Sequence, residues 1–215
     1  MSDATSLEAL DFAALMCSRV CHDIISPVGA ITNGLEVLEE EQNEEMRAFA
    51  LDLIRKSAKT ASAKLKFARL AFGAAGSAGA EVDLGDAEAV ARGYMESEKA
   101  SLVWEAQRQL LPKNRVKLLL NLLLLSISTI PRGGTITLVG TGTAPDVAFR
   151  LTAIGPSPRV PPRLPDLLAG RMGEEGIDAH AIQPYYAGSL ARDAQMTVTL
   201  DKLEDGVVIE AKPAA

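Results

Sequence analysis

The sequence predicts an α+β protein, in which an N-terminal helical hairpin forms a dimeric four-helix bundle and an α/β sandwich follows. Three observations lead to this prediction. Small and apolar residues recur in alternating steps of three and four through residues 14–38, glycines interrupt the helical pattern over 72–83, and short strand-like runs then alternate with helical ones. We therefore expect a hairpin domain at 1–75 and an α/β domain at 80–215.

The first helix is predicted from a capping signal and a continuous seam. Thr5 and Glu8 have the spacing of a capping box. The seam consists of Ala14, Cys17, Cys21, Ile24, Val28, Ile31, Leu35 and Leu38. This pattern is typical of a coiled coil over four heptads. Cys17 and Cys21 are interpreted as small core residues, because cysteines four apart on a helix suit a disulfide poorly and no further cysteine completes a metal site.

A second helix is predicted to begin at Asn43, which two glutamates follow in the first turn. Its seam, between residues 50 and 72, is looser than that of the first helix. One hairpin leaves part of the seam in water, whereas two copies close it into an antiparallel four-helix bundle, so we expect a homodimer. The alternative is that the seam packs on the C-terminal half of the same chain.

The C-terminal half is predicted to place helices on one face of a mixed or antiparallel sheet. Residues 135–142 and 147–155 indicate an antiparallel strand pair, and 196–212 indicate a hairpin around Gly206. The other expected strands are 81–85 and 101–106, the expected helices are 86–99, 114–130 and 178–193, and the expected loop is the proline-rich segment 155–165.

Composition restricts the function. The 215 residues are 47% hydrophobic and carry a formal net charge of −6, which argues against a nucleic-acid partner. No apolar run reaches the ~18 residues of a membrane span, and no signal peptide opens the chain, so we expect a cytoplasmic protein without membrane contact. Residues 55–69 hold six cations and no acid, which indicates either a solvated helix face or a surface for an acidic partner.

His22 lies one position beyond the seam and is therefore expected to face solvent. Its stripe on the helix is Leu15, Arg19, His22, Ser26, Gly29, Asn33 and Glu36, and apart from Leu15 these residues are polar or small, so we expect them to face solvent. An exposed imidazole titrates near neutrality and serves as a base, a nucleophile or a metal ligand, and no second ligand lies in this stripe. Asp23 could accept a proton from one ring nitrogen while the other attacks. Pro27 is expected to bend the helix.

The segment "HDIISPVGAITNGLEVL" resembles the phosphoacceptor box of sensor histidine kinases, H-(E/D)-x-x-(S/T/N)-P-(L/V). His22, Asp23, Ser26, Pro27 and Val28 match it in order. The resemblance implies that His22 is phosphorylated and that the hairpin is a dimerisation and phosphotransfer domain. The other histidine, His180, has no such context and is interpreted as structural or superficial.

The second half resembles the ATP-binding domain of the same kinases without its defining residues. In "NLLLLSISTIPRGGTI" the asparagine-box residue Asn121 is kept, but Leu125 stands at the position of the Mg²⁺-binding asparagine. Ser128 replaces the lysine, and Ala153 replaces the aspartate that reads adenine. Because leucine offers Mg²⁺ no oxygen, ATP binding and autophosphorylation are not expected.

Together the two halves resemble the ChpT-type histidine phosphotransferases of alphaproteobacterial cell-cycle signalling. The resemblance implies a relay from the receiver of a hybrid kinase (CckA-like) to response regulators (CtrA-like and CpdR-like), with Mg²⁺ supplied by the receiver and no cofactor in this chain. Asp23 would orient or deprotonate His22, Arg19 would steady phosphoryl oxygens, and Gly29 and Asn33 would lie under the docked receiver. The alternatives are a non-catalytic receiver-binding adaptor and an ATP-dependent kinase with an atypical pocket.

Overall fold

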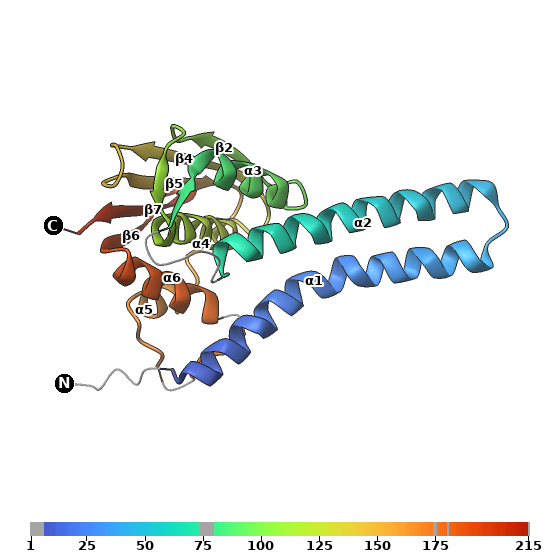
Figure 1. Ribbon diagram of the computed structural model, residues 1–215, viewed down its shortest axis with the longest axis horizontal. Coiled ribbons are helices and arrows are strands. Elements are labelled where there is room, and N and C mark those ends of the chain that lie inside the picture. Colours follow the sequence, from blue (N-terminus) through green and yellow to red (C-terminus); the bar gives the residue numbers. More distant parts are fainter. Residues whose placement is uncertain (1–6, 74–79, 174–175, 180, 215) are drawn as a thin grey trace.

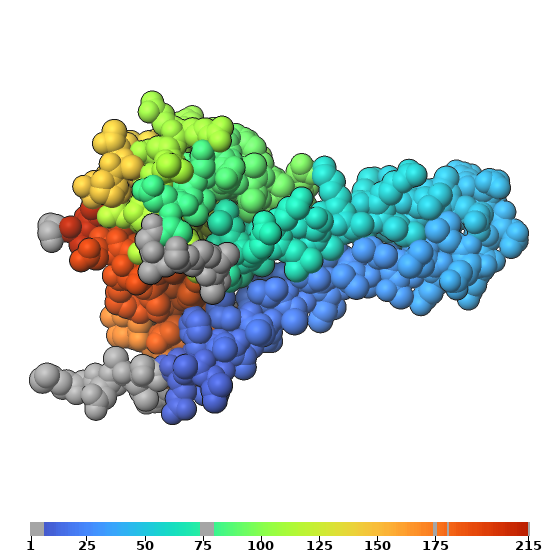
Figure 2. All heavy atoms as spheres, viewed as in Figure 1, coloured from blue at the N-terminus to red at the C-terminus, as the bar shows by residue number. Residues whose placement is uncertain are grey.

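The computed structural model describes residues 7–73, 80–173, 176–179 and 181–214. Two long helices, α1 (Ala9–Glu40) and α2 (Glu44–Ala71), form an antiparallel hairpin that projects from a C-terminal body of sheet and helices (Figure 1). Figure 2 shows that the far half of the hairpin extends well beyond this body. The predicted order of a hairpin followed by an α/β part is confirmed.

The two helix starts differ in how they are capped. Asn43 caps α2 as predicted, because its side-chain oxygen accepts hydrogen bonds from the backbone N–H groups of Glu45 and Met46. At α1 the N-cap residue is Glu8, whose side chain makes no capping hydrogen bond. Thr5, the other member of the expected capping box, lies outside the described residues.

Within the hairpin, Gly34 sets the distance between the helices. A Cβ added to Gly34 would lie 2.7 Å from Ile54 Cγ1 and 3.3 Å from the Ala50 carbonyl oxygen, so only glycine permits this approach. Pro27 is also buried, and Figure 1 shows α1 bending along its course, as expected for a helix with an internal proline.

The seam of α1 is only partly covered within one chain. Ile24, Ile31 and Leu38 are half-buried, whereas Val28 and Leu35 are exposed. Cys17 and Cys21 are both exposed free thiols. The interpretation of these cysteines as core residues is therefore wrong for the single chain, because α2 covers a neighbouring stripe of α1 instead.

The body contains a five-stranded sheet in the order β2-β4-β5-β7-β6, which is mixed as expected. The β2–β4 pair is parallel and the other three pairs are antiparallel. The strands are β2 (Ala100–Glu105), β4 (Gly134–Thr141), β5 (Ala148–Ile154), β6 (Met196–Lys202) and β7 (Gly206–Pro213).

Helices α3 (Leu84–Met95), α4 (Lys113–Thr129) and α6 (Ile182–Asp193) pack against the sheet. α4 runs through the core, since nearly all of its side chains from 115 to 126 are buried. This explains why its sequence is apolar on all sides rather than amphipathic.

Three elements depart from the sequence prediction. Residues Glu81–Asp83 (β1) pair with Leu110–Pro112 (β3) in a small separate sheet, and only the first of these strands was expected. α3 begins directly after β1, where Asp83 caps it. A five-residue helix, α5 (Leu164–Leu168), interrupts the expected proline-rich loop.

The body holds the base of the hairpin through apolar and polar contacts. Phe67 of α2 stacks on Tyr94 of α3 with ring centroids 4.4 Å apart, and Phe12 of α1 lies 5.6 Å from Tyr186 of α6. Asn121, buried in α4, donates to the Ala71 carbonyl oxygen at the end of α2 over 3.1 Å. These contacts fix the first turns of α1 and the last turns of α2 against the body.

Candidate functional site

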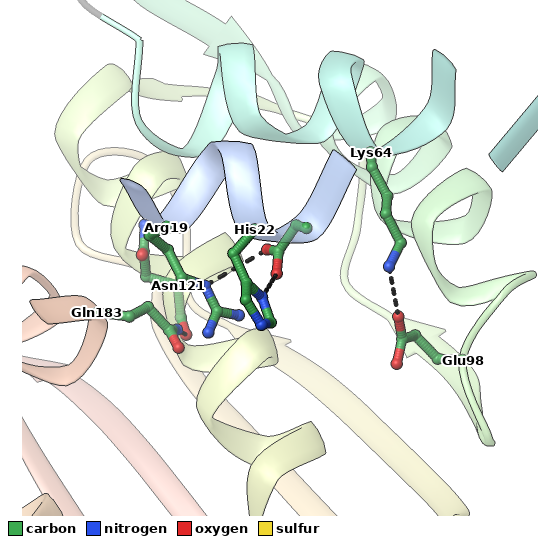
Figure 3. Close-up of polar contacts among 7 residues, drawn as sticks. Arg19, His22, Lys64, Glu98, Asn121 and Gln183 are labelled. Carbon is green, nitrogen blue, oxygen red and sulfur yellow. Dashed lines mark hydrogen bonds and ion pairs between the residues drawn. The ribbon is translucent and has the colours of Figure 1, made fainter. Parts of the chain in front are cut away.

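His22 projects from α1 beside the hairpin base, where the hairpin meets the body. Its side chain is 65% exposed, and its Nδ1 lies 3.4 Å from Asp23 Oδ1 (Figure 3). With Asp23 on the Nδ1 side of the ring, a proton carried on Nδ1 leaves the lone pair on Nε2. This geometry suits a nucleophile that a neighbouring carboxylate orients.

Asp23 is held from its other side by Arg19. Arg19 Nε lies 3.4 Å from Asp23 Oδ2, and the two side chains are only 18% and 19% exposed. Arg19 was expected to face solvent with the other polar residues of the His22 stripe. This expectation is wrong, because the body covers this end of α1. The two contacts, from Arg19 to Asp23 and from Asp23 to His22, lead from the covered side of α1 to its exposed side.

The remaining residues of the expected stripe do face outward. Ser26, Gly29 and Asn33 are all exposed on α1 beyond His22. A Cβ added to Gly29 would meet no described atom within 4 Å, so this glycine is not required by packing within the chain. The surface beside His22 is thus open to a second molecule.

A cleft of about 600 Å³ lies between the hairpin base and the body. Its apolar wall includes Leu124, Leu125 and Ile127 of α4. Six charged side chains, three of each sign, also line it: Arg19, Asp23, Lys64, Glu98, Arg163 and Asp178.

Lys64 and Glu98 form an ion pair across the junction. The Lys64 ammonium of α2 lies 3.7 Å from Glu98 Oε1, which follows α3, and the side chains are 19% and 21% exposed. Lys64 also lies 5.6 Å above the ring centre of Tyr94. Burial raises the pKa of the Tyr94 hydroxyl. The negative charges of the nearby Glu98 and Asp23 carboxylates raise this pKa further.

Lys64, Glu98 and Tyr94 were not singled out from the sequence. The only sequence signal was the run of cations over 55–69, which does not distinguish Lys64 from its solvated neighbours. The pairing depends on how α2 and α3 pack together.

The positions that correspond to a kinase nucleotide site are closed by apolar side chains. Leu125 and Ala153 are buried at 2% and 1% exposure, and neither offers an oxygen or nitrogen to a ligand. Asn121, the residue of the asparagine box that this chain keeps, is used for packing. Its side-chain nitrogen donates to the backbone carbonyl oxygens of Ala71 and Lys117, and the backbone carbonyl oxygen of Asn121 accepts from Gln183 Nε2.

Across residues 7–73, 80–173, 176–179 and 181–214, no group of three or more His, Cys, Asp or Glu side chains could hold a metal ion. In the same part of the chain, no helix is both long and apolar enough to cross a membrane.

The fold and the site define a class of protein: a helical hairpin that bears an exposed histidine, joined to a body of helices on a five-stranded mixed sheet. Comparison with known proteins agrees. Residues 84–206 match the family model of the histidine phosphotransferase C-terminal domain. The chain is 51% identical to protein phosphotransferase ChpT of Brucella abortus (strain 2308) over 212 residues, which cover 99% of this chain and 100% of that protein.

A solved structure of a bacterial phosphotransferase superposes with a TM-score of 0.89 at 49% sequence identity, covering 98% of this chain and all of the other. The chain belongs to the histidine phosphotransferase family, in its ChpT branch. It is therefore a protein phosphotransferase with an α+β fold.

Proposed function

We propose that His22 is the phosphoacceptor of this phosphotransferase, taking a phosphoryl group from a receiver aspartate and passing it to the aspartate of a second receiver. The observation that carries the proposal is the pairing of an exposed imidazole with an oriented carboxylate. His22 Nδ1 contacts Asp23, and Arg19 restrains Asp23.

In the first transfer, Nε2 of neutral His22 attacks the phosphorus of the donor's aspartyl phosphate. The N–P bond forms as the O–P bond breaks, and the donor leaves as a free carboxylate. The ring then carries a positive charge with a proton on Nδ1. Asp23 stabilises that charge or accepts the proton, which yields neutral phosphohistidine.

The second transfer is the reverse reaction with another receiver. The acceptor carboxylate attacks phosphorus, the N–P bond breaks, and the imidazole leaves with its electron pair. Asp23 again supports the developing charge on the ring. In this proposal Mg²⁺ is supplied by the receiver, and this chain contributes the nucleophile and the docking surface.

The receiver docks over the exposed face of α1 in this proposal. Ser26, Gly29 and Asn33 line that face, and the open space above Gly29 accommodates close approach of another backbone. The likeness to a named protein phosphotransferase supports a phosphorelay role in general. Within this proposal the donor is a hybrid-kinase receiver (CckA-like) and the acceptors are response regulators (CtrA-like and CpdR-like), in cell-cycle control within the cytoplasm.

The proposal includes a homodimer built on the hairpin. Large apolar side chains remain exposed on both of its helices: Ile25, Val28, Leu35, Phe49 and Leu65. A second hairpin would cover such a surface in a four-helix bundle. The domain division at 1–75 and 80–215 is proposed on the same grounds, with the C-terminal domain holding the hairpin rather than ATP.

The test is transfer of labelled phosphate. Parent protein and His22→Ala are mixed with a phosphorylated receiver domain, and the label on each chain is followed over time. We expect acid-labile label on the parent and none on His22→Ala. His180→Gln is the matched histidine control and should behave as the parent does.

The same assay separates the alternatives. Transfer through His22→Ala as efficient as through the parent would refute the proposal, and receiver binding without label on the parent would favour an adaptor. Incubation with labelled ATP alone tests the kinase alternative, for which label on His22 is the expected sign.

A further inference from the structure

Phosphorylation of His22 would add negative charge beside Asp23, and a nearby cation would stabilise it. A phosphoryl group brings up to two negative charges to a site where Asp23 already lies beside the ring. Arg19 is engaged with Asp23, and its Nε is buried without a hydrogen-bond partner. A second, mobile cation would compensate the added charge.

Lys64 has the position and the freedom for this role. It lines the same cleft as Arg19 and Asp23, and Figure 3 shows the Lys64 and His22 side chains extending from neighbouring helices toward the same side. Its ammonium group ends a flexible four-carbon chain. Its contact with Glu98 is 3.7 Å, longer than a charge-assisted hydrogen bond of about 2.7–2.9 Å.

The contrast with a neighbouring pair shows what is particular to Lys64. Lys59 and Glu96 join the same two segments, but their side chains are 72% and 57% exposed. Solvent screens that pair, whereas Lys64 and Glu98 are largely withdrawn from water. A charge in the less hydrated setting interacts more strongly with a new anion nearby.

We propose that Lys64 is a phosphoryl-binding residue that moves from Glu98 to the phosphoryl oxygens when His22 is phosphorylated. This inference rests on the proposed role of His22. Glu98, contributed by the C-terminal domain, holds the ammonium group in the empty state and competes with the phosphoryl group for it. The body thereby takes part in phosphotransfer without binding a nucleotide.

The experiment compares Lys64→Met, Glu98→Gln and the control Lys59→Met, all in a His180→Gln background that leaves His22 as the single histidine. Each variant is equilibrated with a phosphorylated receiver domain, and the ratio of phosphohistidine to phosphoaspartate is measured. We expect Lys64→Met to lower the ratio about tenfold, the scale of one charge-assisted hydrogen bond. Glu98→Gln should raise it, and Lys59→Met should leave it unchanged.

The opposite signs distinguish this role from a structural one. If the ion pair only joined the hairpin to the body, Lys64→Met and Glu98→Gln would both change the ratio of phosphohistidine to phosphoaspartate in the same direction. That result would overturn the inference. Lys64→Arg keeps the charge and should retain most of the ratio. If Lys64→Met does not fold, Lys64→Arg and Glu98→Gln still test the inference.

A second readout reports the phosphoryl group directly. The proteins are phosphorylated chemically with phosphoramidate, and the ³¹P resonance is titrated with pH. Since a nearby ammonium group favours the dianion, Lys64→Met should raise the phosphoryl pKa relative to the parent. An unchanged midpoint would contradict the inference, whereas absence of label from His22 in the parent would instead contradict the proposed function.

Discussion

At the scale of single residues, Asp23 connects the covered and exposed sides of α1. Its two carboxylate oxygens face different partners, His22 on one side and Arg19 on the other, each at 3.4 Å. A carboxylate fixed at both oxygens favours one ring orientation and supports charge on the imidazole. In the proposed function, Asp23 therefore acts through His22, as a positioning residue.

Asp23→Asn keeps the shape of the side chain and removes its charge. We expect single-turnover transfer from a phosphorylated receiver to slow by roughly 10²-fold, at the low end for a lost acid–base group. The rate is measured by rapid quench across pH 6 to 9. A loss of charge support should also change the shape of the pH profile, and an unchanged profile with an unchanged rate would show that Asp23 is dispensable.

At the scale of elements, the two glycines of α1 have different roles although they lie five residues apart. Gly34 is buried where α1 meets α2, and Gly29 is exposed on the face beside His22. The first is required by the fold of the hairpin, whereas the second has open space above it and lies, in the proposed function, under the docked receiver. The sequence alone does not distinguish them, because glycine weakens a helix at either position.

Gly34→Val and Gly29→Val separate these roles. The Gly34 substitution inserts a side chain against Ile54 and should destabilise the protein by about 1–3 kcal/mol, the usual cost of overpacking. The Gly29 substitution should change the free energy of unfolding by less than about 1 kcal/mol while weakening receiver binding. Chemical denaturation and titration calorimetry measure the two effects. Equal destabilisation, with receiver affinity unchanged for Gly29→Val, would rule out docking over Gly29.

At the scale of the whole molecule, the hairpin of a single chain leaves large apolar side chains exposed. Phe49 and Ile25 are 65% and 70% exposed, although both belong to helices with otherwise regular apolar faces. Exposed large side chains that gather on one element indicate an interface. The expected interface is the bundle of two hairpins.

The assembly is tested by light scattering of the parent and of Phe49→Glu. The parent should show about twice the chain mass of 22.8 kDa. Phe49→Glu places a charge in the expected interface and should shift the protein toward monomer at micromolar concentration, with helix content by circular dichroism preserved. A parent that remains monomeric at high concentration would contradict the bundle.

The sequence by itself determined the order of elements and indicated His22 as the candidate acceptor. Periodicity over 14–38 placed the first helix and turned His22 outward, because a helix repeats its faces every 3.6 residues. The apolar run at 116–130 indicated the buried helix α4, and Asn43 marked the start of α2. These features depend on neighbours in the chain, which a sequence displays directly.

The tertiary structure alone decided what surrounds His22. Arg19 was expected in solvent and is covered, Asn121 holds the end of α2, and Lys64 meets Glu98 across the junction. The small β1–β3 sheet and the burial of Gly34 were likewise not apparent in the sequence. Each depends on how distant segments pack, because side chains far apart in the chain become partners only when burial of apolar surface brings their elements together.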